Sequence, residues 1–329
     1  MTTGTMHARA SARANIALAK YWGKTDLEHN VPAVPSISLT LDQLVTETEV
    51  CFVEQLESDV VMLDGRTTTA REARRAIAML NRVRQAVGIQ WKATVRSVNH
   101  FPTAAGLASS ASGFAALAVA CTRAAGLELD AEALSALARQ SSASAARSVF
   151  GGFVELPAGK RGESSLTARP IAPQGHWDVR LILALTARGP KSVGSTDAME
   201  RSRRTSPYYQ AWVDHAPRWA VAIKQAIRDR DLATLGTAME HSTIAFHSCA
   251  MTSDPTILYW NPATVAALHT VTGLRDRGVQ AWSTMDAGPH VKVLCEAQDA
   301  ARVQRALQGT PGVLETRIAG PGPGIEVLS

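Results

Sequence analysis

Serine and glycine residues gather in one short segment, residues 102–112, and their spacing there suits phosphate binding. Glycine lets a backbone approach an anion closely. The hydroxyls of Ser109, Ser110 and Ser112 fall where a helix is expected to begin, beside unpaired N–H groups and the positive end of the helix dipole. This is the chemistry of a phosphate cradle without a Walker lysine. A segment rich in Ala, Gly and Ser also permits close helix packing, and the segment alone leaves both interpretations open.

Two other groups of polar residues could act on an anion. Ser144 and Arg147 are three residues apart, so on a helix they share a face and can converge on one ligand. An arginine near a helix end is, by itself, more often a solvated cap. Asp286 ends an expected strand and enters a Gly-Pro turn. A carboxylate there is well placed for general-base catalysis, although a turn-forming aspartate explains it equally well.

Two signals for other kinds of site fail on spacing. The Gly-Lys-Thr sequence at 23–25 looks like the end of a P-loop, but that motif needs a glycine where Leu18 stands. His241 and His247 are six residues apart, so on a helix they point to different sides and do not form a zinc pair. No side chain is therefore assigned as a metal ligand.

Composition narrows the class of protein. The 329 residues include 34 Lys+Arg and 29 Asp+Glu, a net charge of +5, and 46% are hydrophobic. This is a globular composition, with one large domain or two intimate ones, and the charge suits small anions rather than nucleic acid. The four cysteines form no C-x-x-C pair, and we find neither a signal peptide nor an apolar run long enough for a membrane. We expect a soluble cytoplasmic protein without disulfides.

The elements that must position these residues follow from turn residues and apolar periodicity. Strands are predicted at 15–19, 36–41, 45–53, 60–63, 91–98 and 181–185. Thr69 and Glu72 have the spacing of a capping box, and Asp130 is a good N-cap, so a helix is predicted after each. A further short helix is predicted through Arg147, ending at Gly151.

The C-terminal half is predicted to begin with a loop and a long helical region, followed by mixed helices and strands. Residues 192–200 are predicted to be a small-polar loop, and from Pro207 the pattern is helical for a long stretch. Asn261, followed by proline, predicts the start of another helix. After that helix come strand, turn, strand, helix and strand over the last fifty residues. This order predicts half of an α+β sandwich and not a doubly wound parallel sheet.

Taken together, these segments resemble the mevalonate diphosphate decarboxylases of the GHMP kinase superfamily. The resemblance is carried, in family order, by residues 14–24, 34–42, 101–113, 146–152, 246–254 and 285–289. The Lys-Tyr-Trp-Gly-Lys sequence that ends at Lys24 and the Asp-Ala-Gly-Pro sequence that begins at Asp286 are specific to this branch. The glycine- and serine-rich segment alone marks only the superfamily.

The resemblance implies an α+β GHMP kinase fold of two lobes around a deep cleft. The N-terminal lobe, residues 1–187, would be ribosomal protein S5 domain 2-like and carry the phosphate-binding loop. The C-terminal lobe, residues 188–329, would be ferredoxin-like and carry the catalytic aspartate. It further implies a homodimer, ATP and Mg²⁺, and the ATP-dependent conversion of (R)-5-diphosphomevalonate to isopentenyl diphosphate, ADP, phosphate and CO2, with phosphorylation of the 3-hydroxyl on the way. No nucleic-acid or membrane partner is implied.

The resemblance also assigns roles to individual residues. Asp286 would be the catalytic carboxylate beside the 3-hydroxyl, with Lys20 near it and the transferring phosphoryl group, and Arg147 would orient the substrate carboxylate. The substrate and its phosphates would be held by Tyr21, Lys24, Ser142, Ser144, Arg147 and Ser195. The nucleotide's phosphate loop would comprise Gly106, Leu107, Ala108, Ser109, Ser110 and Ser112. We further expect the loop at 191–199 to close over the site, since its residues are small and polar.

This chain departs from the family pattern at two positions. Thr196 stands where some bacterial members have arginine, which removes one cationic contact, and His290 stands where many relatives have asparagine. The open alternatives are a sister enzyme on the same scaffold, either a mevalonate 3-kinase or a phosphomevalonate decarboxylase, and a catalytically silent nucleotide-binding relative. Retention of Asp286 and of the Lys-Tyr-Trp-Gly-Lys sequence favours full decarboxylation over the sister enzymes. The presence of Asp286, Lys20 and Arg147 argues against the silent relative.

Overall fold

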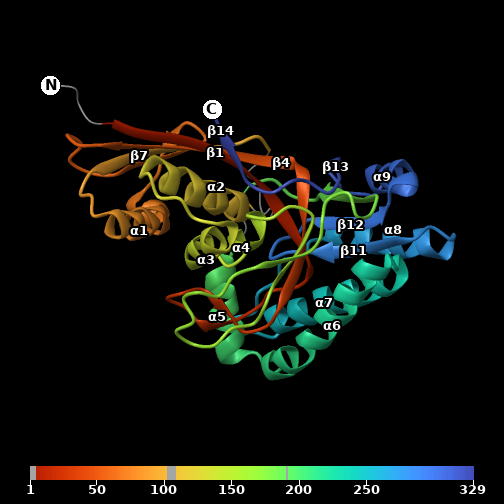
Figure 1. Ribbon diagram of the computed structural model, residues 1–329. Helices are drawn as coiled ribbons and strands as arrows, with labels where there is room; N and C mark the ends of the chain where they lie inside the picture. Colours follow the sequence, from red (N-terminus) through yellow and green to blue (C-terminus); the bar gives the residue numbers. More distant parts are fainter. Residues whose placement is uncertain (1–4, 102–108, 190–191) are drawn as a thin grey trace.

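Two long neighbouring strands, β1 (Thr5–Ala19) and β4 (Ser36–Val53), lie at the centre of the first sheet (Figure 1). They pair antiparallel over most of their length. The strands predicted at 36–41 and 45–53 are therefore one strand, and the strand predicted at 15–19 begins ten residues earlier than expected. The structure is a computed structural model that describes residues 5–101, 109–189 and 192–329.

Six shorter strands complete this sheet within the described residues. They are β5 (Val60–Leu63), β6 (Arg66–Thr67), β7 (Lys92–Asn99), β8 (Phe153–Leu156), β9 (Arg169–Ala172) and β14 (Glu326–Leu328). The order is β14-β1-β4-β7-β5-β6, with β8 paired to the first part of β4 and β9 paired to β8. Only the β5–β7 pair is parallel. A separate small pair joins β2 (Lys24–Asp26) to β3 (Val31–Pro32).

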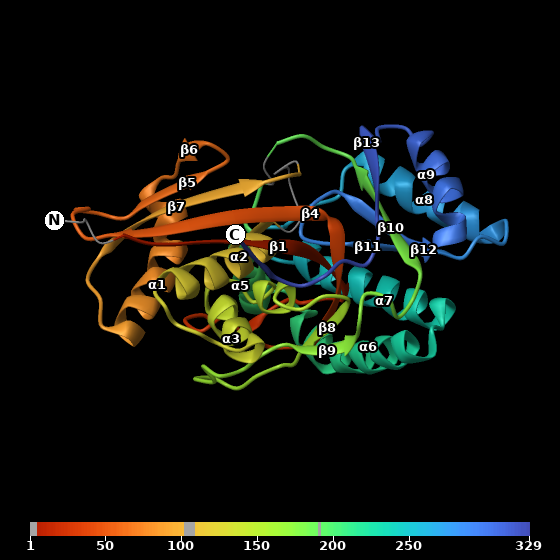
Figure 2. The ribbon, with the colours of Figure 1, turned by 45° about the horizontal axis from the view of Figure 1, so that its top comes forward.

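Helices cover one side of the first sheet (Figures 1 and 2). They are α1 (Ala70–Val87), α2 (Ser109–Ala124), α3 (Ala131–Ser141) and α4 (Ala145–Ser148). Both predicted N-caps are confirmed, because Thr69 closes a capping box with Glu72 and Asp130 accepts from the backbone of Ala133. Helix α2 packs across β1 and β4 through buried alanines, so close packing does explain the small residues in the body of this helix.

The second sheet consists of β10 (Val179–Leu185), β11 (Ala281–Met285), β12 (Val291–Glu296) and β13 (Glu315–Ala319). All of its pairs are antiparallel, in the order β11-β12-β10-β13. The helices α8 (Pro262–Asp276) and α9 (Ala300–Gln308), the latter preceded by the single turn η1 (Ala297–Asp299), connect its strands. This β-α-β-β-α-β arrangement confirms the ferredoxin-like C-terminal lobe.

Three helices lie between β10 and α8, and the first of them corrects the sequence-based prediction. They are α5 (Ser195–Thr205), α6 (Tyr209–Asp229) and α7 (Leu232–Met251). Residues 195–200, predicted as loop, begin α5. Ala198, Met199 and Ser202 are buried on one face of that helix, and this spacing overrides the preference of small polar residues for loops.

Helix α7 packs against both β11 and β1, so it connects the two sheets. One hydrophobic core includes Ile16 of β1, Leu181 of β10 and Leu235 of α7. The α+β class is thus confirmed. The division at residue 187 stays a prediction. Strand β10, which precedes that point, lies in the second sheet, and β14 returns to pair with β1.

Candidate active site

Asp286 lies between two lysine side chains that come from different sheets. It follows β11 directly, and because strand side chains alternate, it faces the same side as Thr284. Lys292 of β12 pairs in register with Thr284 and shares that face. Its Nζ lies 3.2 Å from Asp286 Oδ2. Lys20, the residue after β1, places its Nζ 3.0 Å from Asp286 Oδ1.

These contacts set the charge of the carboxylate. The Lys292 side chain is 0% exposed and that of Lys20 3%, whereas Asp286 keeps 24% exposure. Burial favours a higher pKa for Asp286, but the nearby charges of Lys20 and Lys292 outweigh it and hold the pKa well below its ordinary range. Burial also lowers the pKa of Lys20 to about 8, despite the attraction of Asp286. Asp286 is therefore an ionised carboxylate at neutral pH.

Arg147 is buried in a pocket of neutral oxygen atoms. Its Nη1 and Nε donate to the hydroxyls of Ser36 at 2.5 Å and Ser38 at 2.9 Å, and Nη2 donates to Asn15 Oδ1 at 3.3 Å. No carboxylate of the described residues lies within ion-pair distance of this guanidinium. Burial lowers its pKa to about 10, and the charge of Asp286 acts in the opposite direction. Arg147 therefore stays charged, held in place by hydroxyl and amide groups.

The predicted pairing of Ser144 with Arg147 takes a different form. Helix α4 is a single turn that begins after Ser144, and no hydrogen bond among the described contacts joins the Ser144 hydroxyl to Arg147. That hydroxyl lies 3.1 Å from the hydroxyl of Ser142. Asn15 bridges the segment, because its amide donates to the Ser144 carbonyl while its oxygen accepts from Arg147. Asn15 thus links Ser144 to Arg147, and the hydroxyl contact links Ser142 to Ser144.

The start of α5 meets the Lys-Tyr-Trp-Gly-Lys segment. Lys24 Nζ donates to Asn30 Oδ1 at 2.6 Å and to Thr196 Oγ1 at 3.4 Å. Burial lowers the pKa of Lys24 to about 8. Ser195, the first residue of α5, precedes the threonine that contacts Lys24. Thr196 therefore contributes a hydroxyl that accepts from Lys24.

Tyr21 and Gly23 show how tightly this segment is packed. The Tyr21 hydroxyl is buried with no hydrogen-bond partner among the described residues, and burial raises its pKa. Gly23 has φ +113°, and a Cβ there would lie 2.0 Å from Oη of Tyr209 at the start of α6. Glycine is therefore required beside Lys24, both by its backbone conformation and by the approach of the phenol.

The serine-rich segment is described only in part. Ser109 and Ser110 begin α2, with Ser110 exposed, as the cradle hypothesis requires. Ser112 is fully buried and its Oγ lies 2.6 Å from Thr46 Oγ1, so its hydroxyl is bound internally and does not face an open site. The predicted contacts of Gly106, Leu107 and Ala108 lie outside the described residues, as does Lys191 of the proposed closing loop.

Sequence reasoning missed several residues around Asp286. Lys292 stands within an apolar run, and only the strand register shows that it faces the carboxylate. Ser242 of α7 accepts from the Lys20 backbone N–H at 2.9 Å, and Thr243 Oγ1 lies 3.1 Å from Thr284 Oγ1. Asn15, Ser36 and Ser38 lie within the family-like segments, although none received a role. The sequence signal that could have found these residues is a polar side chain within an otherwise apolar segment.

Two buried histidines border the site. His247 is 1% exposed, whereas His241 is exposed, which confirms that they point to different sides. Burial lowers the pKa of His247 to about 3 and that of His290 to about 4, so both are neutral. His290 Nδ1 accepts from the backbone N–H of Thr186 at 3.2 Å, which places its proton on Nε2.

Three further observations concern the described residues. They contain no group of three or more His, Cys, Asp or Glu side chains that could hold a metal ion. All four cysteines are free, with Cys121 and Cys295 buried as predicted. None of the helices in the described part of the chain is long and apolar enough to cross a membrane.

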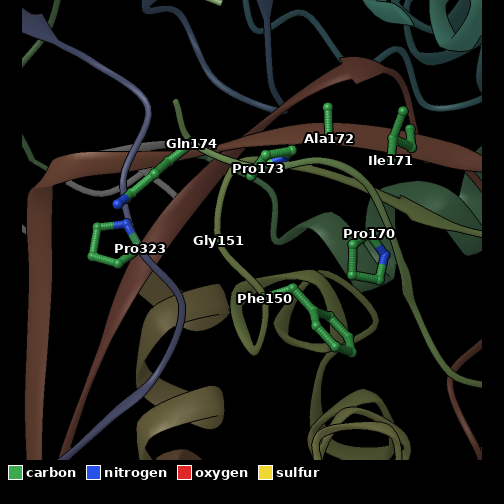
Figure 3. Close-up of a pocket in the computed structure, with 8 residues that line it drawn as sticks. All are labelled: Phe150, Gly151, Pro170, Ile171, Ala172, Pro173, Gln174 and Pro323. Atoms are coloured by element: carbon green, nitrogen blue, oxygen red, sulfur yellow. The ribbon is translucent and has the colours of Figure 1, made fainter. Parts of the chain in front are cut away.

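A hollow of about 420 Å³ lies near Gly151 and the Gly-Pro segment that ends at Gly324 (Figure 3). Its lining is Phe150, Gly151, Pro170, Ile171, Ala172, Pro173, Gln174 and Pro323. Because none of these side chains is ionisable and none was predicted to take part in chemistry, the cluster around Asp286 remains the candidate active site.

The fold and the cluster define a two-lobed α+β protein that holds one carboxylate among three buried cations, an arrangement suited to a small anionic molecule. Residues 12–167 match the family described as the diphosphomevalonate decarboxylase-like N-terminal domain. Residues 181–315 match the mevalonate 5-diphosphate decarboxylase C-terminal domain. The chain belongs to the diphosphomevalonate decarboxylase family.

Individual relatives agree with this assignment. Human diphosphomevalonate decarboxylase is 35% identical over 304 residues, which cover 86% of this chain and 75% of the relative. The crystal structure of mevalonate diphosphate decarboxylase from Staphylococcus aureus has a TM-score of 0.93 and 36% identity, covering 99% of each chain. A solved structure described as MDDEF in complex with MVAPP, AMPPCP and magnesium has a TM-score of 0.92 and 38% identity, covering 99% of this chain and 100% of the other.

Proposed function

We infer that the chain catalyses the ATP-dependent decarboxylation of (R)-5-diphosphomevalonate, yielding isopentenyl diphosphate, ADP, phosphate and CO2. The family membership supports this activity, and so do the ligands of the MDDEF complex, mevalonate diphosphate and an ATP analogue with magnesium. ATP and Mg²⁺ are accordingly the cosubstrate and the cofactor, and the product is an isoprenoid precursor.

One observation carries the proposal. Among the described residues of the site, Lys20 and Lys292 contact a single carboxylate, Asp286, and Arg147 is a third buried cation that makes no ion pair with it. Buried charges are costly unless they are paired, so this excess of positive charge requires an anionic ligand. A substrate with a carboxylate and a diphosphate, together with the phosphates of ATP, supplies that charge.

Asp286 is assigned to the tertiary 3-hydroxyl of the substrate. A tertiary alcohol is a poor nucleophile, so the ionised carboxylate first orients the hydroxyl by accepting its hydrogen bond. As the oxygen attacks the γ-phosphorus of ATP and ADP leaves, the hydroxyl proton passes to Asp286. Lys20 then offsets the charge that gathers on the transferring phosphoryl group.

Arg147 is assigned to the substrate carboxylate, which a planar guanidinium holds better than an ammonium does. Phosphorylation makes the 3-oxygen a leaving group. When the C3–O bond breaks, phosphate departs with the electron pair and positive character develops at C3. The bond from C2 to the carboxylate then breaks to release CO2, and its electrons form the C2–C3 double bond. Arg147, fixed by Ser36 and Ser38, would hold the carboxylate in the orientation that this step requires.

The remaining polar residues are assigned to phosphates. Tyr21, Lys24 and Ser195 would bind the substrate diphosphate, which the contact between Lys24 and the start of α5 supports. Ser142 and Ser144, whose hydroxyls are adjacent, would contact substrate or the γ-phosphate. Ser109 and Ser110, at the N-terminus of a helix of 16 residues, would bind the nucleotide phosphates.

The described residues fit Mg²⁺ that enters with the nucleotide. They contain no group of three or more His, Cys, Asp or Glu side chains that could enclose the ion, and Mg²⁺ commonly binds through substrate phosphates and few protein ligands. The exposed hydroxyl at the start of α2, Ser110, is the protein ligand that we propose. When bound, the ion neutralises charge on the phosphates.

We also propose three properties of the whole molecule. The lobes divide near residue 187, the chain forms a homodimer, and it acts in the cytoplasm. The family resemblance supports the first two, and the four free cysteines suit a reducing compartment. Light scattering at several protein concentrations will test the homodimer.

The decisive experiment supplies Mg-ATP with mevalonate, its 5-phosphate or its 5-diphosphate, and follows CO2 and ADP together. We expect equal amounts of both products, with by far the highest kcat/KM for the 5-diphosphate. ADP without CO2 would identify a 3-kinase, and preference for the 5-phosphate would identify the sister decarboxylase. Absence of turnover with all three would identify a silent relative.

A further inference from the structure

Lys292 is a buried charge to which the proposed mechanism assigns no step. Its side chain is 0% exposed, in the middle of β12, where an unpaired ammonium would be costly. Its Nζ lies 3.2 Å from Asp286 Oδ2, while Lys20 contacts Oδ1 of the same carboxylate. Each oxygen of Asp286 therefore has its own ammonium group.

The two lysines are held by different parts of the fold. Lys292 is placed by the pairing of β12 with β10 and β11. Lys20 is placed by β1 and by the hydrogen bond from its backbone N–H to Ser242 of α7. A partial rotation of the Asp286 carboxylate about its Cβ–Cγ bond would move Oδ1 away from Lys20 and Oδ2 away from Lys292. The arrangement therefore fixes the plane of the carboxylate as well as its position.

We propose that Lys292 is a positioning residue, which acts through Asp286 Oδ2 to keep the carboxylate ionised and oriented toward the 3-hydroxyl of the substrate. This inference rests on the proposed function for the identity of that hydroxyl. The placement of the carboxylate by two lysines is independent of the substrate. In this proposal the effect of Lys292 on the reacting atoms is transmitted through its ion pair with Asp286.

Other charged and titratable groups around Asp286 do not replace Lys292. His247 of α7 and His290 are buried and neutral, with pKa values lowered to about 3 and about 4. Arg147 of α4 is bonded to hydroxyl and amide oxygens and makes no ion pair with Asp286 in the described structure. Without Lys292, Lys20 would be the one remaining ammonium group in contact with Asp286, while burial favours a higher pKa for the carboxyl group. Loss of the second ammonium should therefore raise the pKa of Asp286.

The test compares three variants with the wild-type enzyme. Lys292→Met removes the charge and keeps the length of the side chain, and Lys292→Arg keeps the charge. Lys224→Met is the matched control, because Lys224 pairs with Glu155 outside the site at 2.6 Å. Each protein is examined by circular dichroism, by the pH dependence of kcat and kcat/KM, and by NMR of aspartate labelled with ¹³C at Cγ. The Asp286 signal is the one that Asp286→Asn lacks.

For Lys292→Met we expect the acid limb of kcat and the Asp286 NMR titration to move up together by at least about one pH unit. At pH 6, where Asp286 is ionised in both proteins, kcat should fall at least about tenfold because the carboxylate loses its fixed orientation, while the KM for ATP changes little. Lys292→Arg should recover most of the limb, and Lys224→Met should leave it in place. A wild-type profile in a folded Lys292→Met enzyme overturns the proposal.

The wild-type protein provides a test that does not depend on the variants. Its Asp286 signal should stay in the ionised form at pH values well below 3.8, the ordinary value for aspartate. If that signal titrates at or above the ordinary value, the proposal is wrong even when Lys292→Met fails to fold. An inactive wild-type enzyme whose Asp286 signal behaves as expected would instead refute the proposed function and leave the two-lysine placement intact.

Discussion

At the scale of single residues, the central feature is a carboxylate whose two oxygens face separate ammonium groups. Such a group stays ionised over the whole physiological range and is a weak base. Its contribution is orientation first, and acceptance of a proton only as the new P–O bond forms. Lys20 follows a strand of the first sheet, and Lys292 lies in a strand of the second sheet. The position of the carboxylate therefore depends on both lobes.

Replacement of the carboxylate should separate binding from chemistry. We expect Asp286→Asn to bind ATP as the wild-type protein does and to lose about 10²–10⁴-fold in kcat, because the amide cannot accept the hydroxyl proton. Calorimetry measures the first quantity and CO2 release the second. Asp214→Asn, which alters an exposed carboxylate on α6, serves as the control. Near-normal turnover of Asp286→Asn would refute the assignment.

The fall in kcat/KM at alkaline pH should reflect the deprotonation of two lysines in the site. Burial lowers the pKa values of Lys20 and Lys24 to about 8, so both ammonium groups are present below that pH and are lost as the pH rises through it. We expect log(kcat/KM) to fall above pH 8 with a slope approaching about two. Lys24→Arg, which keeps its charge, should reduce the slope to about one. An unchanged slope in that variant would exclude Lys24 from substrate binding.

The role of Arg147 depends on its planar shape as well as on its charge. We expect Arg147→Lys to raise the KM for diphosphomevalonate roughly 10- to 100-fold, because the ammonium cannot reproduce two parallel hydrogen bonds. The KM for ATP should change much less. Initial-rate measurements with each substrate varied separately test this split. Equal effects on both KM values would indicate that Arg147 only supports the fold.

At the scale of elements, the segment after β1 depends on a glycine and on the helix that faces it. We expect Gly23→Ala to cost about 1–3 kcal/mol in the free energy of unfolding, because φ is positive there and the new Cβ would collide with the Tyr209 hydroxyl. Urea titrations measure the cost. Tyr209→Phe removes that hydroxyl, so the double variant should be more stable than the sum of the single effects predicts. Strict additivity would contradict the contact.

Local signals predicted most elements, and long-range pairing explains what they missed. The caps at Thr69, Asp130 and Asn261 act on their own first turns, so sequence alone could locate them. The start of α5 was assigned to a loop because serine and threonine suit both states, and burial of Met199 decided the outcome. Residues 36–41 and 45–53 became one strand because β1 pairs along both.

Sequence predicted the site residues that lie in family-like motifs. It did not predict those that reach the site through the pairing register of neighbouring strands. Asp286 and Lys20 were correctly expected to lie together, and the ion pair between them confirms it. Lys292 looked like any polar residue of a strand, since the sequence does not show which neighbouring strand it faces. The groups around Arg147 come from positions more than one hundred residues earlier in the chain, which no local pattern could connect.

At the scale of the whole molecule, one hydrophobic core joins the two sheets through α6 and α7. We expect the lobes to unfold together. Leu235→Ala, in that core, should cost about 2–5 kcal/mol while leaving a single transition that coincides by fluorescence and circular dichroism. Val221→Ala, on the exposed side of α6, should change stability little. Two separate transitions in either protein would show that the lobes are independent.

The ion pair between Lys20 and Asp286 also has a consequence for synthesis of the chain. A ribosome completes β1, β4 and α2 long before Asp286 emerges. The reactive carboxylate joins them only when the last strands of the second sheet fold. A growing chain therefore lacks the Lys20–Asp286 pair until translation has nearly ended, and the proposed activity can begin only then.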